Sequence, residues 1–119
     1  MLKRINFVTV AVADQARALD FYTTKLGLRV FTDQTLGDMR WIELQVPHAE
    51  TRVVLFKDDA HRPDPHKPSL AFVADNVVAT YEELRSKGVA FTTPPTKAPW
   101  GEHAIFKDSE GNLVLFAKG

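Results

Sequence analysis

A chain of 119 residues with 45% hydrophobic and 25% charged residues is long enough for one globular domain with its own core, and this composition excludes an intrinsically disordered protein. Fifteen basic residues balance fifteen acidic ones, which excludes the strongly basic surface that binding to a nucleic-acid backbone requires. The chain contains no cysteine, so disulfides, thiolate metal sites and a cysteine nucleophile are also excluded.

No segment has the pattern of a signal peptide or a membrane span. Residues 1–5 lead directly into an alternating strand pattern, without the long apolar stretch that either segment needs. We therefore expect a cytoplasmic protein that binds neither a membrane nor a nucleic acid.

The first 58 residues predict a strand, a helix and three further strands. Residues 5–12 are rich in β-branched side chains that alternate between two faces. Asp14 can cap a helix over residues 14–26, and Gly27 suits the position just after the end of that helix. Strand-like runs separated by turn residues then cover residues 28–33, 39–46 and 51–57.

The second half repeats this order after a linker. Residues 59–67 contain Pro63 and Pro65 among charged residues and predict an extended linker. Asp75 is the expected cap of a second helix, which ends at Gly88. Strands are predicted over residues 69–74, 89–92, 103–107 and 112–117, with a proline-rich crossover over 94–99 and a turn over 108–111.

The two halves align at a constant offset of about 61 residues, which indicates an internal duplication. The shared use of a capping aspartate and a terminal glycine would be weak support by itself, because many α+β proteins use both. The offset pairs Val12 with Val73, Ala13 with Ala74, Asp14 with Asp75, Ala18 with Ala79, and Gly27 with Gly88. We therefore expect a single domain over residues 1–119, with module one at 1–58, a linker at 59–67 and module two at 68–119.

Three segments carry a resemblance to a known family. They are Val-Ala-Asp (12–14) ahead of Ala-Leu-Asp-Phe-Tyr (18–22), Leu-Gly-Leu (26–28), and Phe-Lys-Asp-Ser-Glu-Gly-Asn (106–112). Together with the repeated element order, they make the chain resemble the vicinal-oxygen-chelate superfamily of glyoxalases, bleomycin resistance proteins and extradiol dioxygenases. The pattern is most similar to that of its short, metal-free glyoxalase-like and bleomycin-resistance-like members.

This resemblance implies an α+β fold in which two tandem βαβββ modules form a cupped, half-barrel mixed sheet. Members of the family commonly complete each cup with strands from a second chain. We therefore expect a homodimer, and open sheet edges in so short a chain favour the same expectation.

The resemblance also identifies four inward positions that hold the metal ligands of metal-dependent members. In this sequence the motif alignment puts Phe7, Glu43, Ser69 and Leu115 at those positions, and of these four only Glu43 could bind a metal. Strand alternation independently places Phe7, Ser69 and Leu115 on the face opposite the helix-packed core. Because a divalent ion needs three or four good ligands, we expect neither a metal nor another cofactor.

Several of the inward side chains suit an apolar or aromatic ligand. Trp100 lies in a Pro-Trp-Gly segment similar to one in bleomycin resistance proteins, and it can stack on a planar molecule, cap the sheet or fill a dimer interface. Aromatic residues on strands are also common in ordinary cores. The candidate ligand-binding residues are Phe7, Trp41, Glu43, Phe56, Ser69, Trp100, His103 and Leu115.

Three functional hypotheses remain open from the sequence. The first is a metal-free cup that encloses an apolar or aromatic small molecule. The second is a lyase or dioxygenase-like enzyme for a small carbonyl or glutathione-conjugated substrate, with Glu43 as general base or sole retained metal ligand. Glu43 can equally be solvated or paired with a basic side chain. The third is a regulatory or structural module whose cup is filled by its own side chains, such as Phe7 and Leu115.

Overall fold

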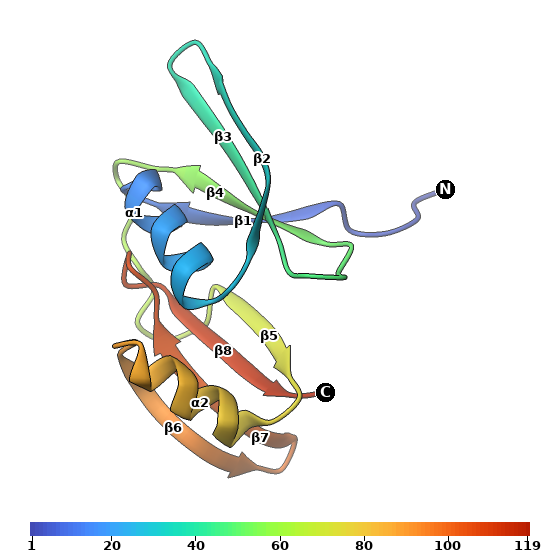
Figure 1. Cartoon of the computed structure of the whole chain (residues 1–119), viewed down its shortest axis with the longest axis vertical. Helices are drawn as coiled ribbons and strands as arrows, with labels where there is room; N and C mark the ends of the chain where they lie inside the picture. Colours follow the sequence, from blue (N-terminus) through green and yellow to red (C-terminus); the bar gives the residue numbers. More distant parts are fainter. The chain divides into compact units, whose positions relative to one another are not determined.

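The computed structural model describes residues 1–119 and contains two compact units, residues 1–61 and residues 62–119. Each unit has one four-stranded mixed sheet and one helical segment, and neither sheet closes into a barrel (Figure 1). No helix has the length and apolar character that crossing a membrane requires.

Both units have the element order βαβββ, as the sequence predicts. The first contains β1 (Phe7–Val12), α1 (Gln15–Asp20), the π-helical turn η1 (Phe21–Lys25), β2 (Arg29–Leu36), β3 (Met39–Gln45) and β4 (Arg52–Lys57). The second contains β5 (Leu70–Ala74), α2 (Val77–Ser86), β6 (Phe91–Ala98), β7 (Gly101–Lys107) and β8 (Leu113–Lys118).

The sheets have the same topology. The strand order is β1-β4-β3-β2 in the first unit and β5-β8-β7-β6 in the second, and only the pairs β1–β4 and β5–β8 are parallel. A parallel pair needs a crossover connection, and in each unit the helix and the two intervening strands supply it. The expected α+β fold of two βαβββ modules is therefore confirmed.

Alternate residues of each sheet pack against the helix of the same unit. The buried apolar side chains of the first unit include Val10, Val12, Ala18, Tyr22, Ile42, Leu44 and Leu55, and those of the second include Val77, Leu84, Ala104, Phe106, Val114 and Phe116. Because strand side chains alternate, the opposite face of each sheet carries the residues between them. The helix-free face of each sheet therefore holds those candidate site residues that lie in strands.

The predicted N-cap of the second helix, Asp75, is wrong. Asn76, and not Asp75, is its N-cap, because the Asn76 side chain accepts a hydrogen bond from the backbone N–H of Ala79 at 3.0 Å. In the first helix, Asp14 caps as predicted, through the N–H of Arg17 at 2.9 Å. The caps are thus 62 residues apart, one more than the offset between Gly27 and Gly88.

The π-helical turn η1 explains this change of offset. One more residue separates Asp14 from Gly27 than separates Asn76 from Gly88. A π turn holds one residue more than an α turn, so η1 absorbs the extra residue and lets Gly27 and Gly88 end both helices at equivalent places. Both glycines have positive φ, at 76° and 86°.

The proline-rich crossover predicted over residues 94–99 is wrong for most of its length. Pro94 and Pro95 lie inside β6, which runs to Ala98. β6 is an edge strand, and its register against β7 shifts between Thr93 and Thr96. Proline fits there because an edge position and a register shift both release backbone N–H groups from pairing.

Candidate functional site

The helix-free face of the first unit carries a group of aromatic side chains. Phe7, Phe31 and Phe56 are 36%, 51% and 44% exposed and come from β1, β2 and β4. Trp41 from β3 lies among them, with its ring centroid 5.6 Å from that of Phe7 in an edge-to-face arrangement. We call these four residues the aromatic face. Such exposed rings on one surface are typical of an interaction site.

An ion pair lies within the aromatic face. The Nε of Arg52 donates to Oε1 of Glu43 at 2.7 Å, and the indole Nε1 of Trp41 donates to Oε2 at 2.8 Å. The Arg52 guanidinium also donates to the Asn6 side chain at 2.8 Å and lies 4.0 Å from the ring centroid of Phe31. Both Glu43 oxygens are therefore engaged, and the alternative in which Glu43 pairs with a basic side chain is the one observed.

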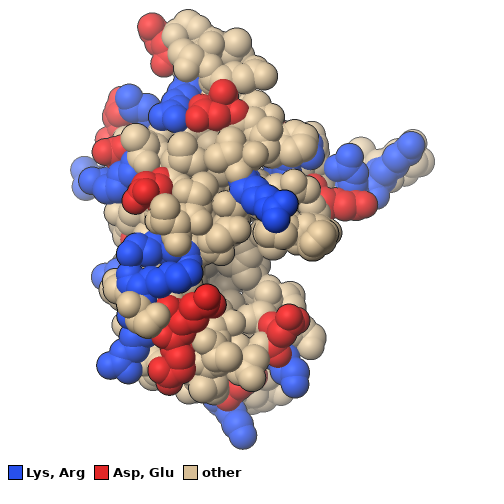
Figure 2. All heavy atoms as spheres, viewed as in Figure 1, with Lys and Arg blue, Asp and Glu red and all other residues tan.

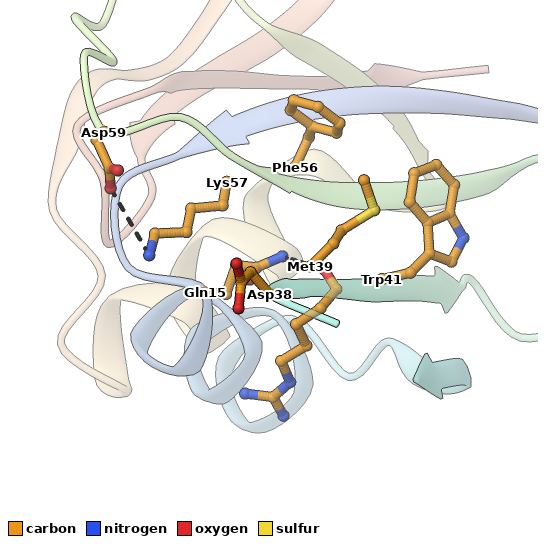
Figure 3. Close-up of a pocket in the computed structure, with 8 residues that line it drawn as sticks. Gln15, Asp38, Met39, Trp41, Phe56, Lys57 and Asp59 are labelled. Atoms are coloured by element: carbon orange, nitrogen blue, oxygen red, sulfur yellow. Dashed lines mark hydrogen bonds and ion pairs between the residues drawn. The ribbon is translucent and has the colours of Figure 1, made fainter. Parts of the chain in front are cut away.

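A pocket of about 370 Å³ adjoins the aromatic face where β3 and β4 separate (Figure 3). The two strands are paired only from Glu43–Val54 to Gln45–Arg52, so the residues that precede this stretch on β3 and follow it on β4 leave a gap. The pocket is lined by Gln15, Asp38, Met39, Arg40, Trp41, Phe56, Lys57 and Asp59. Its volume lies in the range of small-molecule sites.

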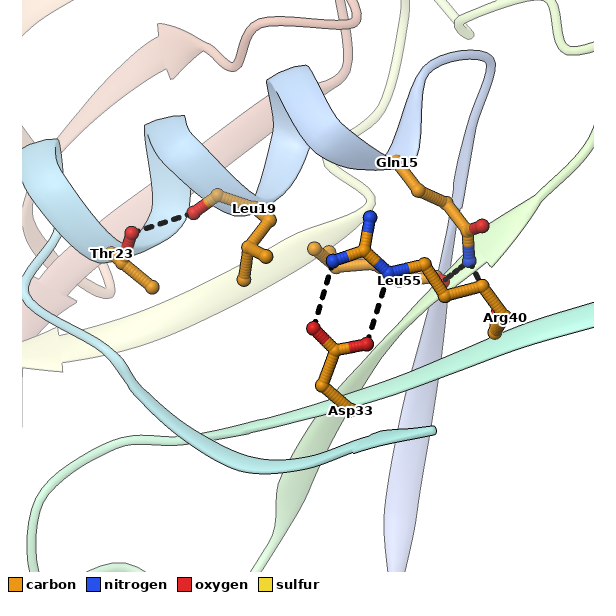
Figure 4. Close-up of polar contacts among 6 residues, drawn as sticks. All are labelled: Gln15, Leu19, Thr23, Asp33, Arg40 and Leu55. Carbon is orange, nitrogen blue, oxygen red and sulfur yellow. Dashed lines mark hydrogen bonds and ion pairs between the residues drawn. The ribbon is translucent and has the colours of Figure 1, made fainter. Parts of the chain in front are cut away.

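Gln15 spans this gap. It is the first residue of α1 and is only 8% exposed. Its amide Nε2 donates to the backbone oxygen of Arg40 at 2.8 Å and to that of Leu55 at 2.9 Å (Figure 4). These two bonds connect β3 to β4 beyond their last paired residues, which stabilises the open end of the sheet.

Arg40 and Asp33 form a two-pronged ion pair across β2 and β3. The Nε and Nη2 of Arg40 donate to the two Asp33 oxygens at 2.9 and 2.8 Å (Figure 4). Hydrogen bonding to Arg40 lowers the pKa of Asp33 below its ordinary value of 3.8. The positive charge of Arg40 is therefore compensated by Asp33, which weakens its attraction for an anionic ligand.

The second unit places His103 and Leu115 on its own helix-free face, whereas Ser69 precedes β5 and Trp100 lies in the turn between β6 and β7. Ser69 is exposed directly before β5, and Leu115 lies on β8 between Ala71 and Ile105. The ring centroids of Trp100 and His103 are 4.4 Å apart with the ring planes tilted by 34°, and Trp100 is 62% exposed. The Nδ1 atom of His103 is buried without a hydrogen-bond partner.

The candidate residues thus fall into two groups. Residues 1–61 bring together Phe7, Trp41, Glu43 and Phe56, and residues 62–119 bring Trp100 next to His103. The face predicted for Phe7 and Leu115 by strand alternation agrees with the observed register, whereas Ser69 lies outside the paired residues of β5.

The residues at the family's metal positions do not fit a metal ion. Phe7 and Leu115 have no donor atom, and both oxygens of Glu43 accept hydrogen bonds from Arg52 and Trp41. No group of three His, Asp or Glu side chains is arranged to hold a metal. The donor set therefore lacks the three or four ligands that a stable divalent site needs.

Two residues of this region, Arg52 and Gln15, were not among those predicted from the sequence. Arg52 meets Glu43 only through the pairing of β3 with β4, and this arrangement has no local sequence signal. Gln15 did have one, because it stands three residues before Ala18 on the buried stripe of the first helix.

Charges are mixed over the visible surface. Figure 2 shows Lys and Arg side chains interspersed with Asp and Glu on both units. This distribution agrees with the formal net charge of zero.

Comparisons with known proteins agree with this architecture. The model of the Glyoxalase/Bleomycin resistance protein/Dioxygenase superfamily matches residues 4–116. The uncharacterized protein YetH of Bacillus subtilis is 35% identical over 117 residues, which cover 97% of this chain and 98% of YetH.

Two solved structures are similar over nearly their whole length. UcmS2 has 33% identity and a TM-score of 0.87, and the match covers 100% of both chains. TnmS3, an antibiotic binding protein from Streptomyces sp. CB03234, has 30% identity and a TM-score of 0.87 and covers 98% of this chain and 96% of its own.

Proposed function

We propose that this chain, which belongs to the glyoxalase/bleomycin resistance protein/dioxygenase superfamily, binds a small planar organic molecule on the aromatic face of residues 1–61. The observation that carries the proposal is the gathering of four aromatic side chains beside a pocket of about 370 Å³, to which Trp41 and Phe56 contribute. Exposed rings offer a flat apolar surface, and the pocket offers depth for part of the ligand.

The similarity to TnmS3 supports the same class of function. TnmS3 is an antibiotic binding protein, and its fold covers nearly the whole of this chain. Planar antibiotics are therefore the first compounds to examine.

We propose further that binding requires no metal or other cofactor. The support is chemical, because the four family positions hold Phe7, Glu43, Ser69 and Leu115, and Glu43 is already bound by Arg52 and Trp41. The enzyme hypothesis depends on Glu43 acting as a base or a ligand. The engagement of both its oxygens lends that hypothesis no support, and we propose binding in its place.

A thermal-shift screen tests the binding proposal. Planar antibiotics and glutathione adducts are each added to the purified protein, and a true ligand at a hundred times its Kd stabilises the folded state by about 2.7 kcal/mol. Phe56→Ala should weaken binding about tenfold, because it removes one exposed ring from the aromatic face. Val78→Ala, which shortens a side chain of similar exposure on α2, is the matched control. A ligand that binds both variants as it binds the parent protein contradicts the proposed site.

Elemental analysis tests the metal-free part. The protein is purified, incubated with nickel, zinc, iron and manganese salts, and desalted. We expect far less than one equivalent of any metal. One equivalent that Glu43→Gln abolishes would overturn this part of the proposal.

A further inference from the structure

The Gln15 amide has one polar atom left for a ligand. Two backbone oxygens, of Arg40 and Leu55, take hydrogen bonds from its Nε2. A carbonyl oxygen can only accept, so these two contacts fix which end of the amide is the NH₂ group. The remaining atom, Oε1, has no hydrogen-bond partner in the protein, although the side chain is only 8% exposed and lines the pocket.

Two cations and two carboxylates also border the pocket. Arg40 is bound by Asp33 through two hydrogen bonds, and Lys57 lies 3.7 Å from the carboxylate of Asp59. Asp38, which has no ion-pair partner, adds a second acceptor. Gln15 Oε1 and the Asp38 carboxylate are thus two acceptors at the pocket, beside the apolar walls of Met39, Trp41 and Phe56 that Figure 3 shows.

We infer that the pocket selects aromatic ligands that carry a hydrogen-bond donor, such as a phenolic hydroxyl or an aromatic N–H, and that Gln15 Oε1 is the acceptor that selects them. This inference rests on the proposed function, since it concerns the same site. The acceptor is held in place before binding, so little ordering cost is added when the ligand donates to it. A ligand that offers only an acceptor would leave Oε1 unpaired and meet it with a like partial charge.

A matched pair of probes separates donation from burial. 2-Naphthol and 2-methoxynaphthalene share the same ring system, but only the first can donate. The ether is the more apolar, so it would bind at least as tightly if apolar burial alone decided affinity. The readout is the indole N–H signal of Trp41 in a nitrogen-15 NMR titration, identified by comparison with Trp100→Phe, since the chain has two tryptophans.

We expect 2-naphthol to bind the parent protein about fivefold more tightly than the ether, which corresponds to about 1 kcal/mol. In Gln15→Met, which keeps the length of the side chain and removes the acceptor, the two affinities should become equal. Asp38→Ala should keep the fivefold preference.

Each contrary outcome has a distinct meaning. Equal affinities in the parent protein, or a preference for the ether, would overturn donor selection while leaving the proposed function intact. A preference that disappears in Asp38→Ala would overturn the assignment to Gln15, and this variant gives that answer even if Gln15→Met does not fold. If neither probe shifts the Trp41 signal at millimolar concentration and the antibiotic screen is also negative, the proposed function itself fails.

Discussion

Arg52 holds the polar part of the aromatic face together. Its guanidinium joins Glu43, the Asn6 side chain and the ring of Phe31, and the side chains of Arg52 and Glu43 are only 18% and 15% exposed. A half-buried carboxylate that loses its cation keeps most of its desolvation cost and loses the compensating attraction. The pair is therefore more important for stability than an exposed ion pair.

We expect Arg52→Met to lower the free energy of unfolding by about 1–3 kcal/mol, because Glu43 is left with Trp41 alone. Combining it with Glu43→Gln should restore part of this loss, since the uncompensated charge disappears. Urea unfolding of the two single variants and the double variant measures the coupling. Arg29→Met on the exposed edge strand β2 serves as the control and should change stability by less than about 0.5 kcal/mol. Additive losses in the double variant would refute the coupling.

The ion pair of Asp33 and Arg40 makes the free energy of unfolding depend on pH in the acidic range. The pKa of Asp33 is lowered in the folded state by its hydrogen bonds to Arg40, so the pair stabilises the fold above the ordinary value of 3.8. As the pH falls below that value, the unfolded chain takes up the proton first, and the contribution disappears once the folded state is protonated too.

Asp33→Asn should therefore lower the stability at pH 7 by a few tenths of a kcal/mol, a small value because the pair is partly exposed. The difference from the parent protein should shrink as the pH falls below 3.8, and it should vanish once Asp33 is protonated in the folded state too. Urea unfolding at pH 7 and pH 3 checks this. Asp59→Asn, whose partner Lys57 is 3.7 Å away and exposed, should show no such change between the two pH values. An equal loss at both pH values for Asp33→Asn would contradict the linkage.

At the scale of elements, the start of α2 distinguishes two neighbouring polar residues. Asn76 accepts the hydrogen bond from the Ala79 N–H, and Asp75 lies one residue before the cap. Asn76→Ala should lower the free energy of unfolding by about 1 kcal/mol, whereas Asp75→Ala should have a much smaller effect. Thermal unfolding followed by circular dichroism compares them, and a larger loss for Asp75→Ala would show that the cap is wrongly assigned.

The π-helical turn η1 accommodates one residue that the second helix lacks. Deleting Thr24, an exposed residue of this turn, should leave a regular α-helix and cost less than about 1.5 kcal/mol. Deleting the exposed Glu83 from α2, which has no spare residue, rotates the rest of that helix by about 100° and turns Leu84 away from the core. That variant should unfold. Circular dichroism and urea unfolding compare the two deletions, and equal losses would refute the role of η1.

At the scale of the whole molecule, open sheet edges favour association. β1 and β2 are edge strands of one sheet, and β5 and β6 are edge strands of the other. Unpaired edge backbone is usually protected in stable proteins, either by blunting residues or by a partner. Pro94 and Pro95 already blunt β6.

We therefore retain the expectation of a symmetric homodimer. Size-exclusion chromatography with light scattering should give twice the 13.4 kDa of the chain. A mass of one chain at all protein concentrations would contradict it.

Local chemistry made much of the fold predictable. Three features depend only on residues that are close in the chain. They are the alternation that buries Val10 and Val12, the capping of the first helix by Asp14, and the positive φ of Gly27. The same local signals failed where a tertiary condition decided. From the sequence alone Pro94 predicts the end of a strand, and only its place in an edge strand shows why the strand continues. Asp75 and Asn76 are both suitable N-cap residues by type, and only the start of α2 in the structure distinguishes them.

The sequence by itself determined the duplicated βαβββ architecture and the helix-free side of the strands, because periodicity and residue type carry that information. Only the tertiary structure decided what Glu43 does and where the pocket lies. Both depend on strand register, which brings Arg52 opposite Gln45 and next to Glu43 and ends the pairing of β3 with β4 at Glu43–Val54. Pairing between strands far apart in the chain is a long-range property, and no residue carries a local signal for it.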